Sequence, residues 1–211
     1  PECHYQVRET ESASSSSDED ETDDTSGYTH INLVNKDTFK NAAYRTTHDC
    51  LTGAKAILDN YPLTKGKYGD SQHVYQLLAR LNGGVVQTDS KNADYARACI
   101  DRHLENGRPI IVGVFCYFDS HINDGVTDHF VVITGRGFDE VDKAYYYTYV
   151  ETGISNSDIA TDPEENRFYY NELLNQWVDE ESCRWDMLYI ITQVRPNDGE
   201  TANTTPQPSK K

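Results

Sequence analysis

The sequence predicts an α+β fold, in which N-terminal helices pack on an antiparallel β-sheet. Between residues 50 and 106, apolar residues recur at spacings of three and four, which is the period of an amphipathic helix. From Ile110 onward the period changes, and runs rich in β-branched and aromatic residues are separated by turn residues. Because the helices precede the strands instead of alternating with them, an antiparallel sheet is favoured over a parallel one.

Three helices are expected ahead of the sheet. The first runs over about 50–60 and carries its apolar residues on one face. The second is expected to begin after Ser71 and to bury the apolar residues that follow at helical spacing, which are Val74, Leu77, Leu78 and Leu81. The third spans about 93–106, and Gly107 ends it. Its inward face is expected to contain Ala96, Cys99, Ile100, His103 and Leu104.

The strands are expected at residues 110–117, 130–134, 145–150 and 187–194. A short helix is expected near 170–178, before the last of these strands. The sequence contains no internal repeat, and a chain of 211 residues is long enough for one domain with a substantial core.

The ends of the chain differ in composition from this domain. Residues 1–27 are rich in Ser, Asp and Glu, and we expect them to form an extended acidic linker. The folded domain is expected over 28–195, and the Pro- and Thr-rich tail over 196–211 is expected to be disordered. Since the chain begins with Pro1, we expect it to be a processed product or a piece of a longer polypeptide.

Composition argues against several classes of partner. The net charge is −16, and no stripe of Lys and Arg offsets it, so nucleic acid and anionic lipid are not expected as partners. No run of about 18 apolar residues is present, so we expect no membrane insertion. The five cysteines are odd in number and irregularly spaced, which predicts at least one free thiol.

Cys50 is the candidate nucleophile. It follows Asp49 at the start of the first expected helix, where unpaired N–H groups and the helix dipole favour thiolate over thiol. His129 opens a strongly apolar strand and is the candidate general base. A cysteine that begins a helix and a histidine that begins a later strand is an arrangement typical of thiol hydrolases.

Glu151 is the candidate third catalytic residue. If strands 130–134 and 145–150 form a hairpin, His129 lies opposite Glu151 on the same face, and Glu151 can accept the Nδ1–H of the imidazole. A register slip of one residue would turn Glu151 away and leave Thr148 or Asn156 as the next candidates.

A metal site is a weaker interpretation. The residues that would have to converge are His48, Cys50, His121, Asp128 and His129. Their spacing matches none of the usual zinc patterns, so we expect neither a metal nor another cofactor.

Two segments resemble known cysteine peptidases. Residues 44–58 resemble the start of NlpC-type bacterial cell-wall peptidases, in which an Asp-Cys pair opens the helix. Residues 107–115, together with 128–135, are similar to the family of double-glycine leader peptidases. The resemblance implies a papain-like fold and a cysteine peptidase or amidase activity carried by Cys50 and His129.

The chain departs from these families at two points. The glutamine that supplies an oxyanion donor before the cysteine is missing, so the oxyanion site is expected to combine the Cys50 backbone N–H with Tyr44 or His48. The third catalytic residue is Glu151 where those families have Asp, Asn or His.

The leading hypothesis from the sequence is therefore a thiol-dependent amide-bond hydrolase acting on a peptide. By analogy with secreted antibacterial effectors, the substrate is expected to be a peptidoglycan stem peptide, the location the bacterial periplasm after secretion or delivery, and a partner a cognate inhibitor protein. One alternative is a protein deamidase or acyltransferase with the same three residues. Another is a catalytically inactive, immunity-like module that binds a partner, and a cytoplasmic location also stays open.

Overall fold

The computed structural model describes residues 28–41, 49–80, 86–88, 90–116, 126–173, 175–183 and 187–199. The expected acidic linker over 1–27 and most of the expected tail, from residue 200 on, lie outside the described residues.

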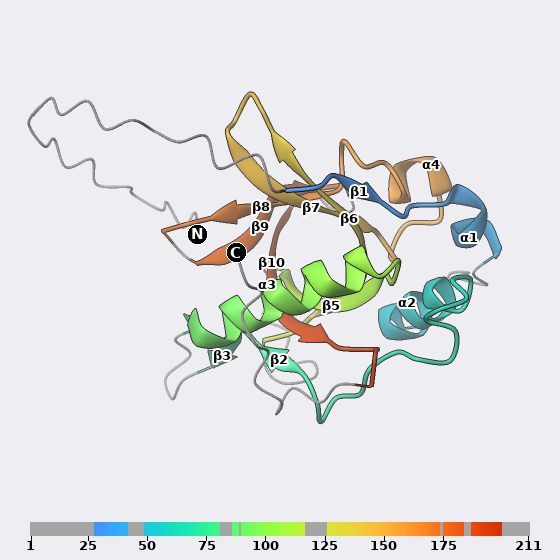
Figure 1. Cartoon of the computed structure of the whole chain (residues 1–211), viewed down its shortest axis with the longest axis horizontal. Helices are drawn as coiled ribbons and strands as arrows, with labels where there is room; N and C mark the ends of the chain where they lie inside the picture. Colours follow the sequence, from blue (N-terminus) through green and yellow to red (C-terminus); the bar gives the residue numbers. More distant parts are fainter. Residues whose placement is uncertain are drawn as a thin grey trace, which may run out of the picture.

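Six antiparallel strands form a closed barrel (Figure 1). These strands are β5 (Ile110–Cys116), β6 (His129–Asp139), β7 (Ala144–Val150), β8 (Arg167–Asn171), β9 (Gln176–Ser182) and β10 (Met187–Arg195). Each pairs with its neighbour in the order β6-β5-β10-β9-β8-β7, and β7 then pairs with β6 again, which closes the ring. Two short strands, β1 (Ile31–Asn32) and β2 (Tyr75–Gln76), add to β6 and β10 respectively.

The barrel corrects the predicted fold class. The strands expected at 110–117, 130–134, 145–150 and 187–194 are all present, but they belong to a closed barrel with few helices. The predicted papain-like α+β fold, with N-terminal helices packed on a sheet, is therefore wrong. Its physical premise fails because β8 and β9 bridge β7 and β10, so the sheet closes on itself.

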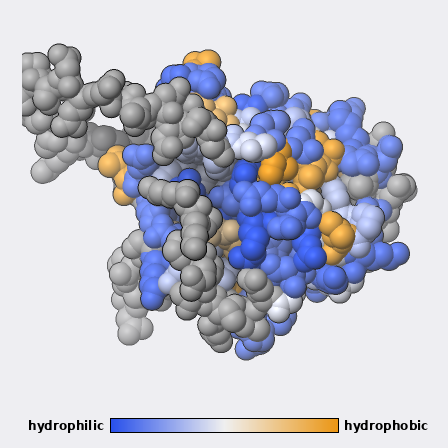
Figure 2. All heavy atoms as spheres, viewed as in Figure 1, coloured by the Kyte–Doolittle hydropathy of each residue, from blue (hydrophilic) through white to orange (hydrophobic). Residues whose placement is uncertain are grey.

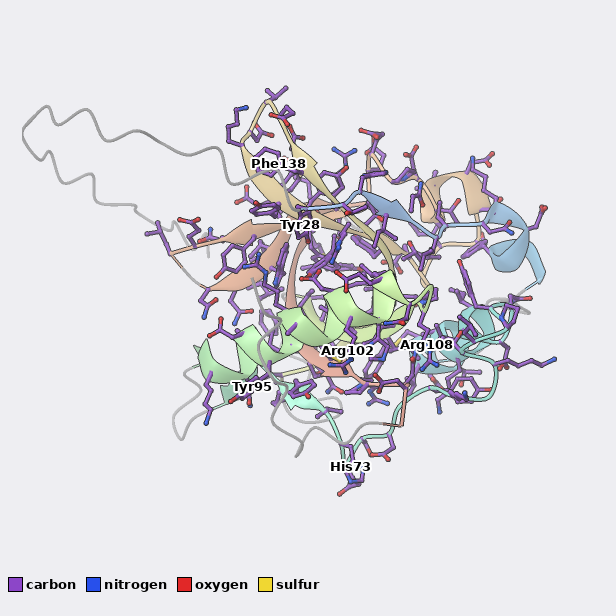
Figure 3. All side chains as sticks on the ribbon, viewed as in Figure 1. Tyr28, His73, Tyr95, Arg102, Arg108 and Phe138 are labelled. Carbon is purple, nitrogen blue, oxygen red and sulfur yellow. The ribbon has the colours of Figure 1, made fainter. Side chains whose placement is uncertain are left out.

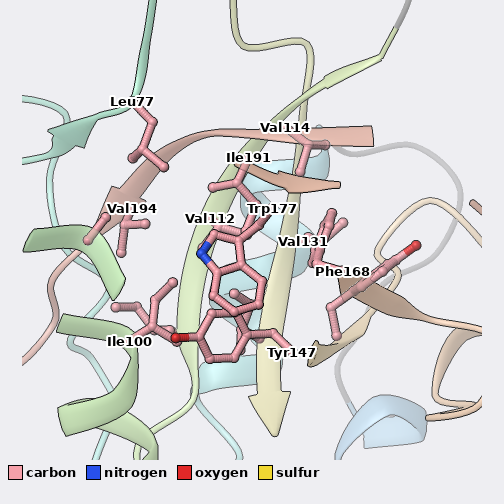
Figure 4. Close-up of a cluster of buried hydrophobic side chains, with 14 of the residues drawn as sticks. Leu77, Ile100, Val112, Val114, Val131, Tyr147, Phe168, Trp177, Ile191 and Val194 are labelled. Carbon is pink, nitrogen blue, oxygen red and sulfur yellow. The ribbon is translucent and has the colours of Figure 1, made fainter. Parts of the chain in front are cut away.

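Aromatic and aliphatic side chains together fill the interior of the barrel (Figure 4). Tyr147, Phe168 and Trp177 are buried there, and the rings of Tyr147 and Trp177 lie 4.1 Å apart between centroids. Helix α3 (Ser90–Glu105) extends this core, because Ile100 and Leu104 pack in the same cluster. The exterior face in Figure 2 is mainly hydrophilic with scattered apolar residues, as expected where the large apolar groups point inward.

A second apolar cluster joins helix α2 (Cys50–Leu58) to the outer face of the barrel. The helix buries Ala54, Ile57 and Leu58 against outward-facing residues of β6, among them Phe130 and Val132. Helices α1 (Lys36–Asn41) and α4 (Ser157–Ala160) lie on this side of the barrel, away from α3 (Figure 1). The first residue of α2 is thereby brought to the start of β6.

Two predicted helices are not formed. The segment after Ser71 gives β2 and then β3 (Leu78–Arg80), which pairs with β4 (Val86–Thr88). Leu77 and Leu78 are buried all the same, because β2 lies along β10 and Leu77 packs in the interior cluster, while Leu81 lies outside the described residues. The segment 170–178 is the hairpin between β8 and β9, where Asn175 has a φ of 48° at the turn.

The domain's contacts continue beyond residue 195. Asn197 is buried and donates its side-chain N–H to the carbonyl of Pro109 at 2.8 Å. Asp198 accepts a hydrogen bond at 3.1 Å from Arg102, which projects from α3 (Figure 3). Residues 196–199 are therefore tied to the C-terminal end of α3.

Candidate active site

Asp49 fixes the start of α2 and so the position of Cys50. The backbone of Asp49 is extended, and its carboxylate accepts hydrogen bonds from the Thr52 N–H at 2.8 Å and from the Thr52 hydroxyl at 3.0 Å. This is an N-cap, and these bonds also hold the pKa of Asp49 below its ordinary value. Cys50 is half-buried as the first residue of the helix, as the sequence predicts.

His129 begins β6 and faces the barrel interior, since it pairs with the inward-facing Val114 of β5. On the other side of β6, Val132 pairs with Val150 of β7. If the same register is continued by one residue, Glu151 lies opposite Val131. Glu151 is then a diagonal neighbour of His129 and does not lie directly opposite it. The shift from the predicted register is two residues, which leaves Glu151 on the same face.

The predicted contact between His129 and Glu151 is present, but through the other ring nitrogen. His129 Nε2 lies 2.7 Å from Glu151 Oε1, where we expected Nδ1. Because a carboxylate can only accept, Nε2 carries the proton of this bond. Nδ1 is then the nitrogen left to face Cys50.

The Glu151 carboxylate is held from several directions. Its side chain is 0% exposed and that of His129 is 3% exposed. Oε1 also accepts the backbone N–H of Gly153, and Oε2 accepts the hydroxyl proton of Tyr189 at 3.2 Å. A buried carboxylate needs such donors, because burial removes its hydration.

Cys50 and His129 are hydrogen-bonded to one another. Burial opposes ionisation of the Cys50 thiol, but the hydrogen bond and positive charge of His129 lower the pKa of the thiol below its ordinary value. The N–H groups of Phe130 and Leu51 act in the same direction. Burial likewise opposes the charged imidazole, yet Glu151 and Cys50 raise the pKa of His129 to about 9. A thiolate–imidazolium pair is the state that these shifts favour.

The alternative third residues do not take the place of Glu151. Asn156 caps α4 by accepting the N–H of Asp158 at 3.0 Å. Thr148 is a middle residue of strand β7, where it pairs with Gly135 of β6. The two oxyanion candidates, Tyr44 and His48, lie outside the described residues.

Sequence reasoning missed two residues of the site. Thr152 has its hydroxyl 3.5 Å from His129 Nε2 and donates it to the Phe130 carbonyl at 2.6 Å. Tyr189 contacts Glu151 from β10. Tyr189 and Ile191 are two residues apart in the last strand, so their side chains lie on the same face. This spacing was a signal that could have placed Tyr189 inside the core.

Other features of the described residues do not include the three catalytic candidates. A cavity of about 430 Å³ is lined by Tyr170, Asp179 and Glu180, among others, and by none of the three candidates. Within the described ranges, no group of three or more His, Cys, Asp or Glu residues is arranged to hold a metal ion, and His48 and His121 lie outside those ranges. None of the described helices has the length and apolar character needed to cross a membrane.

Comparison of the chain with protein-family models, with curated proteins and with solved structures gave no match. The site must therefore be interpreted from its own geometry.

Proposed function

We propose that the protein is a thiol-dependent amide-bond hydrolase with Cys50 as nucleophile, His129 as general acid and base, and Glu151 as the residue that orients His129. One observation carries the proposal, namely the continuous hydrogen-bonded series from the Cys50 sulfur through His129 to the buried Glu151. A cysteine and its base, with the base held by a third group, is the common arrangement of covalent thiol catalysis.

The reaction follows from the charges of these groups. The Cys50 thiolate attacks the amide carbonyl and forms a C–S bond, while the carbonyl oxygen takes up negative charge. His129 then gives its proton to the leaving nitrogen, the C–N bond breaks, and a thioester remains on Cys50. Neutral His129 next removes a proton from water, whose oxygen attacks the thioester and releases the acid and the thiolate. The N–H groups at the start of α2 are suited to stabilise the oxyanion.

The proposed substrate is a peptide amide, and peptidoglycan stem peptides are the first candidates. This choice is supported by the two sequence segments that resemble bacterial cysteine peptidases and not by any contact in the site. A secreted protein delivered to the bacterial periplasm, opposed by a cognate inhibitor protein, is the proposed setting.

Thiol reactivity tests the chemistry without a known substrate. Iodoacetamide at pH 6.5 should alkylate Cys50 faster than Cys183, which serves as the matched control. Cys183 is also half-buried, but burial, Glu151 and Asp179 raise the pKa of its thiol to about 12. Mass spectrometry of the digested protein measures both rates. Equal labelling of the two cysteines would refute the proposed nucleophile.

Purified cell-wall sacculi test the substrate. New free amines should appear with the wild-type protein and with Cys183→Ala, while Cys50→Ala should lose at least about a thousandfold in rate. If the wild type releases none but hydrolyses another amide, the cell-wall assignment fails and the chemistry stands. A mass increase of about one dalton on a protein target would instead indicate deamidation, in which water attacks the same kind of thioester.

A further inference from the structure

The barrel interior next to the site contains two tyrosine–carboxylate pairs. Tyr189 of β10 donates its hydroxyl to Glu151 Oε2 at 3.2 Å, and Tyr149 of β7 donates its hydroxyl to Asp179 Oδ2 at 2.7 Å. Both tyrosines are almost fully buried, and their ring centroids lie 6.3 Å apart. The two pairs are therefore alike in chemistry and burial, but only the first contacts the proposed catalytic residues.

We propose that Tyr189 is a positioning residue of the active site, whose hydroxyl fixes the Glu151 carboxylate in the orientation that holds His129. The inference rests on the proposed function, because it assigns Tyr189 a role in the chemistry of Cys50. Tyr189 does not contact Cys50 through this bond and acts through Glu151.

The geometry of the carboxylate explains why a donor to its second oxygen is needed. Rotation about the last side-chain bond of a glutamate is soft, so one bond to His129 does not fix the plane of the carboxylate. The Gly153 N–H and the His129 Nε2–H both meet Oε1, whereas the Tyr189 hydroxyl meets Oε2. Donors on both oxygens define the plane and keep Oε1 toward the imidazole.

The negative charge of Asp179 makes the Tyr189 hydroxyl more important for Glu151. Asp179 interacts electrostatically with Glu151, and burial together with this charge raises the pKa of Asp179 to about 6. The other titratable groups near this carboxylate pair are Tyr149, Glu181 and Cys183. Without the Tyr189 hydroxyl, Oε2 would be a buried anionic oxygen that faces a second acid and has lost a donor.

Loss of the hydroxyl should weaken the stabilisation of the imidazolium. A carboxylate that has lost this donor and can rotate would hold the charged His129 less well. Because His129 lowers the pKa of the Cys50 thiol, the thiolate would form only at higher pH. The ring of Tyr189, 5.9 Å from the His129 ring between centroids, is retained when Tyr is replaced by Phe.

The test compares Tyr189→Phe with the matched control Tyr149→Phe. The alkylation rate of Cys50 by iodoacetamide is measured by mass spectrometry from pH 4 to pH 9 in the full chain. We expect the midpoint of the rate profile to rise by about one pH unit in Tyr189→Phe and to stay at the wild-type value in Tyr149→Phe. An unchanged midpoint in Tyr189→Phe, or an equal shift in both variants, would overturn the inference.

A second replacement covers the case in which Tyr189→Phe does not fold. A ring-fluorinated tyrosine at position 189 keeps the hydroxyl and makes it a stronger donor, so the midpoint should move to lower pH. A midpoint that does not move, or that moves upward, contradicts the proposed role.

The wild-type profile separates this inference from the proposed function. If wild-type Cys50 shows no reactive thiolate below its ordinary pKa range of about 8.5, the proposed function fails and the role of Tyr189 fails with it. If the wild type shows that thiolate and the two replacements leave it unchanged, only the role of Tyr189 is refuted.

Discussion

Two buried histidines in this chain have opposite properties, although each lies next to a cysteine. His103 is 1% exposed and its Nδ1 is 3.5 Å from the sulfur of Cys99, but burial lowers the pKa of its imidazole. Nδ1–H of His103 donates to the Cys99 carbonyl, and Nε2 accepts the N–H of Asn197, which is the pattern of a neutral ring. Nε2 of His103 also lies 3.6 Å from the carboxylate of Asp198, whose side chain is 14% exposed, whereas the Glu151 carboxylate is fully buried and only 2.7 Å from His129.

The contrast leads to a prediction for Glu151→Gln. The amide keeps the size of the side chain and an acceptor oxygen but removes the charge that offsets burial. The pKa of His129 should fall from about 9 to about 6.5 or below, and the thiol pKa of Cys50 should rise as the imidazolium is lost. An NMR titration of the imidazole resonances measures the change, with His103 as the internal control. A His129 pKa that stays near 9 would show that Glu151 is not the source of the shift.

The three candidate residues and the contact between His129 and Glu151 could be predicted from sequence, but the ring nitrogen that makes this contact could not. Cys50 and His129 each stand at the start of a regular element, and alternation along a hairpin brings Glu151 to the face of His129. Glu151 contacts Nε2 in place of Nδ1, and the register differs by two residues from the predicted one; β-strand periodicity predicts neither of these details. The Tyr189 contact depends on strand pairing across the barrel, which has no local signal.

At the level of elements, the N-cap of α2 links helix stability to the nucleophile. Asp49→Ala removes the acceptor for the Thr52 N–H and should lower the free energy of unfolding by about 1 kcal/mol. Asp49→Ser, which can cap the helix without a charge, should recover most of that loss. Denaturant unfolding of the three proteins measures the difference. Equal stability of the Ala and Ser variants would show that the cap does not hold the helix.

The elements that sequence analysis predicted correctly each contain a stretch with one environment. α3 presents an apolar face to the interior cluster, and β5, β6, β7 and β10 each contain consecutive residues that are buried on both faces of the barrel wall. The helix expected near 170–178 is absent because this segment forms two strands and a turn. The side chains of Phe168 and Trp177 point into the barrel from these strands, while Leu173 at the turn is 97% exposed. The apolar residues of this segment therefore belong to two strands and a turn, and not to one helical face.

At the level of the whole molecule, closure of the barrel was not predictable from local pattern. It requires β7 to pair on both edges, with β6 and with β8, and it requires β10 to pair with β5 as well as with β9. Periodicity identifies strands but carries no information on which strands are neighbours when the connections are not tight hairpins. The same closure creates the enclosed space in which Glu151 and Asp179 are buried together.

Enclosing Asp179 should make the stability of the protein depend on pH. Mainly through burial, the pKa of Asp179 rises to about 6 in the folded protein, against its ordinary value of 3.8. Between these values the folded protein binds a proton that the unfolded chain has released, so this group makes stability fall as pH rises from about 4 to about 6. The destabilisation caused by burying the charged Asp179 carboxylate is then fully present at pH 7.

Asp179→Asn removes this titration and keeps an oxygen that can accept the Tyr149 hydroxyl. The variant should be more stable than the wild type by about 3 kcal/mol at pH 7 and no more stable at pH 4, as measured by denaturant unfolding at both pH values. Asp139→Asn is the opposite control, because hydrogen bonds from the Asp142 and Val141 N–H groups lower the pKa of that carboxyl. It should lose stability at pH 7. If Asp179→Asn were instead no more stable than the wild type at pH 7, the charged Asp179 carboxylate would be well solvated or paired in the folded protein, and the barrel would impose no penalty on it.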